Sequence, residues 1–275
     1  MTETKRDWGD PEVTVARIAF RRGERAWEAY DDNSYDHQAS EGPRTTATPP
    51  RMRTTWSACF DGRRLGTVAT VPAPDMNAIA LAGVHQLAPG QRAPFTHGKS
   101  KAFSGWMHME VHHPIVLSTA DSCDDPEHWK RAVWPPDLLT RVFPQLRKAV
   151  AGISGCDKNG AAAGPYEFGP EDVVLGDAYL SNRGDRIVTA SIRQKKEVVG
   201  TCDMLDEPWS PQTFAVLAGG TVRYLGSSMQ VLDAGDYDGD GHSEVLFQFA
   251  GYDYDGYTLF WNDFKDKVTY GWIYH

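Results

Sequence analysis

The sequence lacks long hydrophobic runs and has fewer basic than acidic residues. No stretch of about 18 apolar residues occurs in the chain, which argues against a transmembrane helix. Lys and Arg number 28 against 37 Asp and Glu, a formal net charge of −9, so the field around the protein repels phosphate backbones. We therefore expect neither membrane insertion nor nucleic-acid binding.

Sequence motifs of catalysis are also missing. The chain has no Gly-x-Ser-x-Gly elbow, no phosphate-cradling glycine loop, no His-Glu-x-x-His and no paired Cys/His nucleophile signature. A carboxylate pair for glycoside hydrolysis depends on the fold and not on sequence spacing, so that alternative stays open. These absences favour a protein that is not an enzyme.

Cysteine is scarce, with only Cys59, Cys123, Cys156 and Cys202 and no Cys-x-x-Cys pair. The spacing disfavours a zinc ribbon or a thioredoxin-type motif. Two disulfides formed in an oxidising compartment would explain the even number, and four buried free thiols are the alternative. Of the three connectivities we favour Cys59–Cys123 and Cys156–Cys202, because each pairing stays within one half of the chain.

The abundant residues favour short β-strands joined by turns. Aromatic residues reach 11%, and Gly and Pro number 26 and 17. The segment 54–71 predicts a hairpin with Asp61-Gly62 at its turn. A series of short strand-like segments between residues 173 and 274 predicts an antiparallel meander, a sandwich or propeller-like sheets. We therefore predict a mainly β fold.

One segment departs from the strand pattern. Apolar residues at helical spacing predict one or two short helices around 137–151, where Pro144 should kink or split the helix. The Gly- and Ala-rich stretch 154–170 that follows is the best candidate for a boundary. We expect a β-rich region over 1–152 that ends in this helix and a β-meander over 153–275, or one continuous domain.

An acidic loop lies within the meander, in the sequence Asp236-Tyr-Asp238-Gly-Asp240-Gly-His242-Ser-Glu244. Three carboxylates at alternate positions, a glycine after the third and a further carboxylate make an oxygen cage that suits Ca²⁺. We expect side-chain ligands from the four acids and a backbone carbonyl ligand from His242. The alternative is an acidic turn without an ion, although like charges this close repel one another without a cation.

The flanks of this loop distinguish between two kinds of calcium motif. An EF-hand requires a Glu at the twelfth position and helices on both sides, whereas here the twelfth position is Phe247 and the flanks alternate as strands. The segment from Asp236 to Leu246 instead resembles the strand–loop–strand calcium motif of FG-GAP and VCBS repeats, found in integrin-α-type propellers and many secreted bacterial proteins. The resemblance rests on one good copy of the loop and implies Ca²⁺ as its ligand.

The expected compartment follows from the loop and the cysteines. The N-terminal segment 1–8 has no apolar stretch typical of an export signal, which taken alone argues for the cytoplasm. Extracellular calcium loops bind with dissociation constants of roughly 10⁻⁴ to 10⁻³ M and fill only outside the cytosol. We therefore favour a secreted or periplasmic protein in which an initiator Met replaces the export signal.

A second metal site is a weaker candidate. His108, Glu110 and His112 alternate in the sequence, so a strand would place all three on one face. Such a face could hold zinc or copper. A polar, solvated strand face is the simpler interpretation.

Aromatic residues crowd the C-terminus, and Tyr270, Trp272 and Tyr274 would share one strand face. Exposed rings at this spacing stack on sugars, whereas buried rings pack the core. The sequence thus predicts a calcium-binding extracytoplasmic protein that acts as a binding or structural module, with a carbohydrate or another secreted protein as a further partner. The alternative is a secreted hydrolase, for example a carbohydrate-active one, with a structural calcium ion.

Overall fold

The computed structural model divides the chain into two compact units. It describes residues 2–5, 13–30, 42–45, 47, 50, 52–73, 84–92, 100, 102–103, 114–151, 154–156, 161–193, 210–250 and 254–273. Unit 1 comprises Met1–Trp129 and Gln230–His275, and unit 2 comprises Lys130–Met229. Both consist mainly of antiparallel strands, which confirms the predicted mainly β fold. The predicted boundary between residues 152 and 153 stays a prediction, because compactness alone does not define an independently folding domain.

Unit 1 contains a six-stranded sheet with the strand order β1-β2-β7-β6-β5-β8. Its strands are β1 (Thr2–Lys5), β2 (Val13–Arg17), β5 (Thr54–Phe60), β6 (Arg63–Pro72), β7 (Val84–Leu87) and β8 (Val116–Ser118). The predicted hairpin is confirmed, because β5 and β6 pair antiparallel around Asp61 and Gly62. Their φ angles of 54° and 65° are both positive, as a two-residue hairpin turn that matches the twist of the strands requires.

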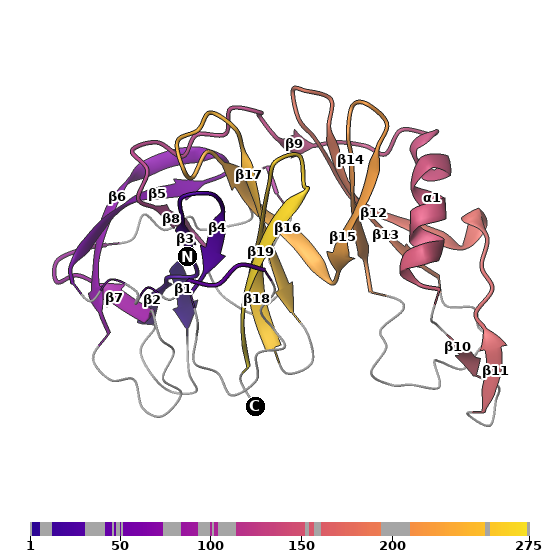
Figure 1. Cartoon of the computed structure of the whole chain (residues 1–275), viewed down its shortest axis with the longest axis horizontal. Coiled ribbons are helices and arrows are strands. Elements are labelled where there is room, and N and C mark those ends of the chain that lie inside the picture. The colour runs from indigo at the N-terminus through magenta and orange to yellow at the C-terminus, as the bar shows by residue number, and fades with distance from the viewer. Residues whose placement is uncertain are drawn as a thin grey trace. The chain divides into compact units, whose positions relative to one another are not determined.

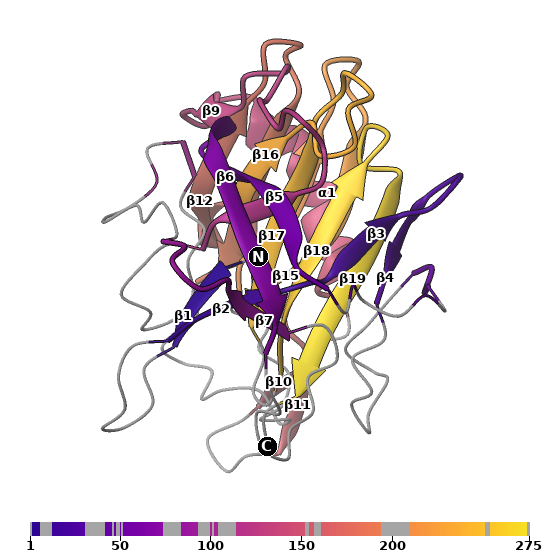
Figure 2. The ribbon, with the colours of Figure 1, turned by 90° about the vertical axis from the view of Figure 1, so that its left-hand side faces the viewer.

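A four-stranded meander forms the second sheet of unit 1. Its strands, in spatial order, are β16 (Met229–Gly235), β17 (Glu244–Ala250), β18 (Tyr254–Trp261) and β19 (Asp266–Ile273). A short hairpin of β3 (Phe20–Arg22) and β4 (Trp27–Ala29) lies beside β19 (Figure 2). Buried side chains of both sheets share one core, in which Trp56 and Cys59 of β5 join Leu246 of β17 and Tyr257 of β18.

Gly256 allows strands β17 and β18 to pack closely. It pairs with Phe249, and a Cβ atom at this position would collide with the Phe249 ring and lie 2.5 Å from the Tyr270 carbonyl oxygen. We expect Gly256→Ala to lower the free energy of unfolding by about 1–3 kcal/mol, the usual cost of overpacking, as measured by urea denaturation. Gly219→Ala is the control, since a methyl group there meets no atom within 4 Å. Equal effects of the two substitutions would contradict the packing argument.

The predicted disulfide between Cys59 and Cys123 is confirmed. The two sulfur atoms are bonded and the two Cα atoms lie 6.1 Å apart. The bond joins β5 to the segment that follows β8, in the core of unit 1. Cys156 lies on β10 (Ser154–Cys156), but Cys202 lies outside the described residues, so the second disulfide stays a prediction.

Unit 2 is a five-stranded sheet with one helix against it. The strand order is β15-β14-β13-β12-β9, with β9 (Lys130–Arg131), β12 (Val173–Leu180), β13 (Arg186–Ile192), β14 (Gln212–Val216) and β15 (Val222–Ser227). Helix α1 (Leu138–Ala149) lies beside this sheet (Figure 1), and its apolar side chains share a core with those of the strands. Strand β10 pairs with β11 (Ala162–Pro165), and the 3₁₀ helix η2 (Pro170–Asp172) leads into β12.

Helix α1 continues through Pro144 as one helix, so the expected alternative of two helices is not seen. Proline removes an intrahelical hydrogen bond at a cost of about 3 kcal/mol. Leu138, Val142 and Leu146 are buried on both sides of the proline, and each contributes roughly 1.5–3 kcal/mol of burial. Their packing offsets the lost bond.

Within the described part of the chain, no helix has the length and apolarity to span a bilayer.

Candidate metal centre

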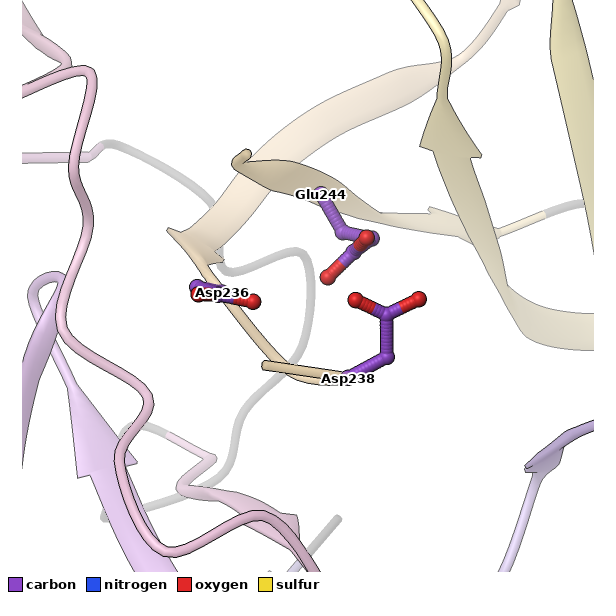
Figure 3. Close-up of side chains that lie close together, drawn as sticks. All are labelled: Asp236, Asp238 and Glu244. Carbon is purple, nitrogen blue, oxygen red and sulfur yellow. The ribbon is translucent and has the colours of Figure 1, made fainter. Parts of the chain in front are cut away.

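The acidic loop, residues 236–244, connects β16 to β17 in unit 1. Asp236 and Asp238 lie within the loop, and Glu244 is the first residue of β17. One carboxylate oxygen of each residue lies within 4.8 Å of the other two. Figure 3 shows the three carboxylates pointing toward a common centre. The hairpin between two strands therefore brings three acids of the sequence pattern together.

Asp236 organises the backbone of the loop. Its Oδ1 accepts hydrogen bonds from the N–H groups of Gly239 at 2.7 Å and Asp240 at 3.0 Å, and its Oδ2 accepts one from Gly241 at 2.9 Å. Gly239 and Gly241 have φ angles of 79° and 86°, which residues with a side chain rarely adopt. Hydrogen bonds from its own backbone therefore hold the loop around the Asp236 carboxylate. Gly239 and Gly241 allow the backbone conformation that these bonds require.

Asp240 and His242 lie on the exposed side of the acidic loop. Asp240 Oδ1 accepts a hydrogen bond from the His242 N–H at 2.8 Å, and Asp240 is not part of the group of three carboxylates. The structure thus brings together three of the four predicted side-chain ligands. The ligand roles of Asp240 and of the His242 carbonyl stay predictions.

Glu244 is the buried member of the group, with 2% of its surface exposed. Its Oε2 accepts a hydrogen bond from the Tyr237 N–H at 2.8 Å. Burial raises the pKa of Glu244, the hydrogen bond from the Tyr237 N–H lowers it, and the charges of the loop aspartates raise it further. The net result is a pKa of about 8. A cation among these carboxylates would act in the opposite direction, because it favours the charged form.

Arg22 is the cation beside the loop that the sequence analysis missed. From β3, its Nε donates a hydrogen bond to Asp238 Oδ2 at 2.6 Å. The two residues are 216 positions apart, so no local pattern could have indicated the contact. When ionised, the three converging carboxylates and Asp240 carry four negative charges, and the guanidinium of Arg22 compensates one of them. The remaining negative charge attracts cations.

The segment that follows β8 supports the other side of the loop. The Asp236 N–H donates to the Asp124 carbonyl oxygen at 3.3 Å, and Ser243 Oγ donates to Asp125 Oδ1 at 2.5 Å. The disulfide at Cys123 ties this segment covalently to β5. The position of the acidic loop therefore depends on the N-terminal sheet of unit 1 as well as on its own hairpin.

The remaining candidates from the sequence do not join this site. The second metal candidate lies outside the described residues: His108, Glu110 and His112. Tyr270 is fully buried in the core of unit 1, so its ring packs the core, the second of the two roles considered for it. The side chain of Trp272 and all of Tyr274 lie outside the described part of the chain, and their predicted role in stacking is untested.

Comparison of the chain with protein-family models, curated proteins and solved structures gave no match. The resemblance to FG-GAP and VCBS repeats therefore rests on the residues of the loop alone. What the geometry defines is a class of site: three converging carboxylates, one of them buried, with oxygen as the only donor atom. Hard divalent cations prefer such a donor set.

Proposed function

We propose that the protein binds one Ca²⁺ ion in the acidic loop and acts as a binding or structural module outside the cytoplasm. The observation that carries this proposal is the convergence of the carboxylate oxygens of Asp236, Asp238 and Glu244 within 4.8 Å. Calcium takes six to eight oxygen ligands, so loop carbonyls and water would complete its coordination. The ion would join the end of β16 to the start of β17.

The chemistry of the donor set favours calcium over magnesium. Calcium takes six to eight oxygen ligands in a flexible geometry, whereas Mg²⁺ demands a near-ideal octahedron and dehydrates reluctantly. Three carboxylates that converge within 4.8 Å offer the kind of oxygen cage, built from protein groups, that calcium accepts.

The disulfide supports the extracytoplasmic part of the proposal. Disulfides persist in oxidising compartments, and the Cys59–Cys123 bond lies in the core beside the segment that holds the loop. Calcium loops of moderate affinity fill in the same compartments, where calcium is abundant. One environment thus satisfies both features.

Calcium is expected to stabilise the folded chain. A ligand that binds only the folded state adds RT ln(1 + [L]/Kd), which is about 1–2 kcal/mol at about 5 mM Ca²⁺ for a Kd of roughly 10⁻⁴ to 10⁻³ M. The measurement is urea unfolding at pH 7 in CaCl₂ and in EDTA, followed by circular dichroism. MgCl₂ at the same concentration should produce a smaller increment.

Glu244→Gln separates metal binding from folding. The glutamine carbonyl still accepts the Tyr237 N–H hydrogen bond, and the lost carboxyl group is one whose pKa burial already raises to about 8. In EDTA at pH 7 we expect this variant to be at least as stable as the wild type, because its side chain does not titrate, and we expect it to lose the calcium increment. Asp121→Asn removes an exposed carboxylate of unit 1 and is the control that keeps the increment. A full increment in Glu244→Gln would exclude this site.

A further inference from the structure

Unit 1 contains a cavity of about 410 Å³, and Tyr237 and Asp238 of the acidic loop belong to its lining. The rest of the lining comes from the β2–β3 segment, β4 and Tyr30, Pro50, β5, β8 and its following residues, β17 and β18. The volume lies within the roughly 300–1,000 Å³ typical of small-molecule sites. We propose that this cavity binds a small organic acid with a flat, ring-shaped apolar body and one carboxylate.

Aromatic side chains form much of the wall. Trp27 from β4 and Trp56 from β5 line the cavity together with Tyr237 from the loop, and Phe20 and Tyr30 complete the aromatic lining. Aromatic rings pack favourably against the face or edge of a flat apolar group. The aromatic wall therefore favours a ligand with a flat apolar ring.

Two buried hydrogen-bond donors in this lining have no partner within the described part of the chain. They are Nε1 of Trp27 and the hydroxyl of Tyr237, whose residues are only 7% and 5% exposed. A buried donor left without an acceptor destabilises the folded state. A carboxylate offers only acceptor oxygens and can satisfy donors of this kind. The orphan donors therefore select the polar end of the ligand.

The charges of the lining favour an anion. Three arginines, Arg17, Arg21 and Arg22, and one acid, Asp238, line this cavity in a chain of net charge −9. Arg22 is the cross-strand partner of Trp27, so their side chains start from neighbouring positions. Asp238 accepts from Nε of Arg22, and a guanidinium has further N–H groups that can pair with a carboxylate.

Three probes of one ring and different charge test the proposal: phenylacetate, phenylacetamide and phenethylamine. Titration calorimetry with the full chain in EDTA keeps the result independent of calcium binding. We expect phenylacetate to bind with one-to-one stoichiometry, about tenfold or more tighter than phenethylamine, since charge-assisted hydrogen bonds are the strong ones. Absence of binding by all three at about 10 mM, a concentration that detects even millimolar affinity, would overturn the proposal.

Conservative variants locate the binding. Tyr237→Phe removes an orphan donor and keeps the ring, and Trp27→Phe removes the other donor and keeps an aromatic side chain, so we expect folding to be retained and phenylacetate affinity to fall about five- to tenfold. Trp129→Phe is the matched control, because its Nε1 is equally buried and without a partner in the described residues but does not line the cavity. Arg22→Gln should reduce phenylacetate affinity to that of phenylacetamide. Equal effects of Trp27→Phe and Trp129→Phe, or equal affinity for the three probes, would refute the assignment.

Discussion

Removal of the Cys59–Cys123 disulfide is expected to lower the free energy of unfolding by about 4 kcal/mol. The bond closes a loop with a sequence separation of 64, and the chain-entropy relation for a loop of this length gives about 4 kcal/mol at 25 °C. Both cysteines are fully buried, so the lost cross-link is accompanied by loss of core packing. Urea unfolding under oxidising conditions measures the effect.

The loss should extend to the acidic loop. A Cβ atom on Gly235 would lie 2.5 Å from the Cys123 carbonyl oxygen, which shows how closely the end of β16 approaches the disulfide. The next residue, Asp236, donates its N–H to the Asp124 carbonyl oxygen. Without the cross-link this support is less ordered, so we expect the calcium-dependent increment in stability to fall together with the stability itself.

Single and double substitutions distinguish the cross-link from packing. Cys59→Ala and Cys123→Ala each break the bond, so each should cost nearly as much as the double variant, and the three values should be strongly non-additive. If the two single effects instead sum to the effect of the double variant, the bond contributes nothing beyond the volume of its sulfur atoms. Titration of free thiols in the wild-type chain is the control for oxidation.

Local patterns predicted most of the strands, because alternation and turn chemistry act within a few residues. Strands β12 to β19 lie between residues 173 and 274, where the sequence predicts short strands, and the Asp61-Gly62 turn lies where the sequence places it. The hairpin of β3 and β4 was not predicted, since its three-residue strands are too short to alternate visibly. Strands β10 and β11 fell in a Gly- and Ala-rich stretch that we interpreted as a boundary.

The candidate metal centre likewise combines residues that are close in sequence with residues that are far apart in it. Asp236, Asp238 and Glu244 converge because one hairpin loop carries them, and their spacing is visible in the sequence. Arg22 and Asp125 reach the loop from far along the chain, through contacts that only the packing of the two sheets creates. The cavity belongs to this second kind, since segments far apart in the sequence, from Ala16 to Leu259, line it.

Asp233 is expected to make the stability of the protein fall steeply as pH rises. The residue lies on β16 with 2% of its surface exposed, and its Oδ1 accepts hydrogen bonds from the N–H groups of Gly62 at 2.8 Å and Ala234 at 2.9 Å. Burial raises the pKa of Asp233, the two hydrogen bonds lower it, and the nearby charges of Asp61 and Asp125 raise it further. The net result is a pKa of about 8. In the unfolded chain an aspartate has a pKa of about 3.9.

The direction in which the free energy of unfolding changes with pH depends on how many protons the folded and unfolded states bind. Between about pH 4 and pH 8 the folded state holds a proton on Asp233 that the unfolded state has lost, so the free energy of unfolding falls by about 1.4 kcal/mol per pH unit. This contribution is complete below about pH 4, the unfolded pKa, and is lost as pH rises through about 8. Glu244 adds a fall of the same direction in EDTA, because burial raises its pKa to about 8 as well.

Asp233→Asn isolates the effect of this one carboxyl group. The asparagine carbonyl can accept the same two N–H groups, but the side chain does not titrate, and the contribution of Glu244 is common to both proteins. We expect the difference in unfolding free energy, wild type minus variant, to fall by roughly 4 kcal/mol from about pH 5 to about pH 8. Asp121→Asn, which removes an exposed carboxylate, measures the effect of net charge alone. If the wild type and Asp233→Asn unfold with parallel pH profiles, Asp233 is charged in the folded protein and a partner for its second oxygen must exist.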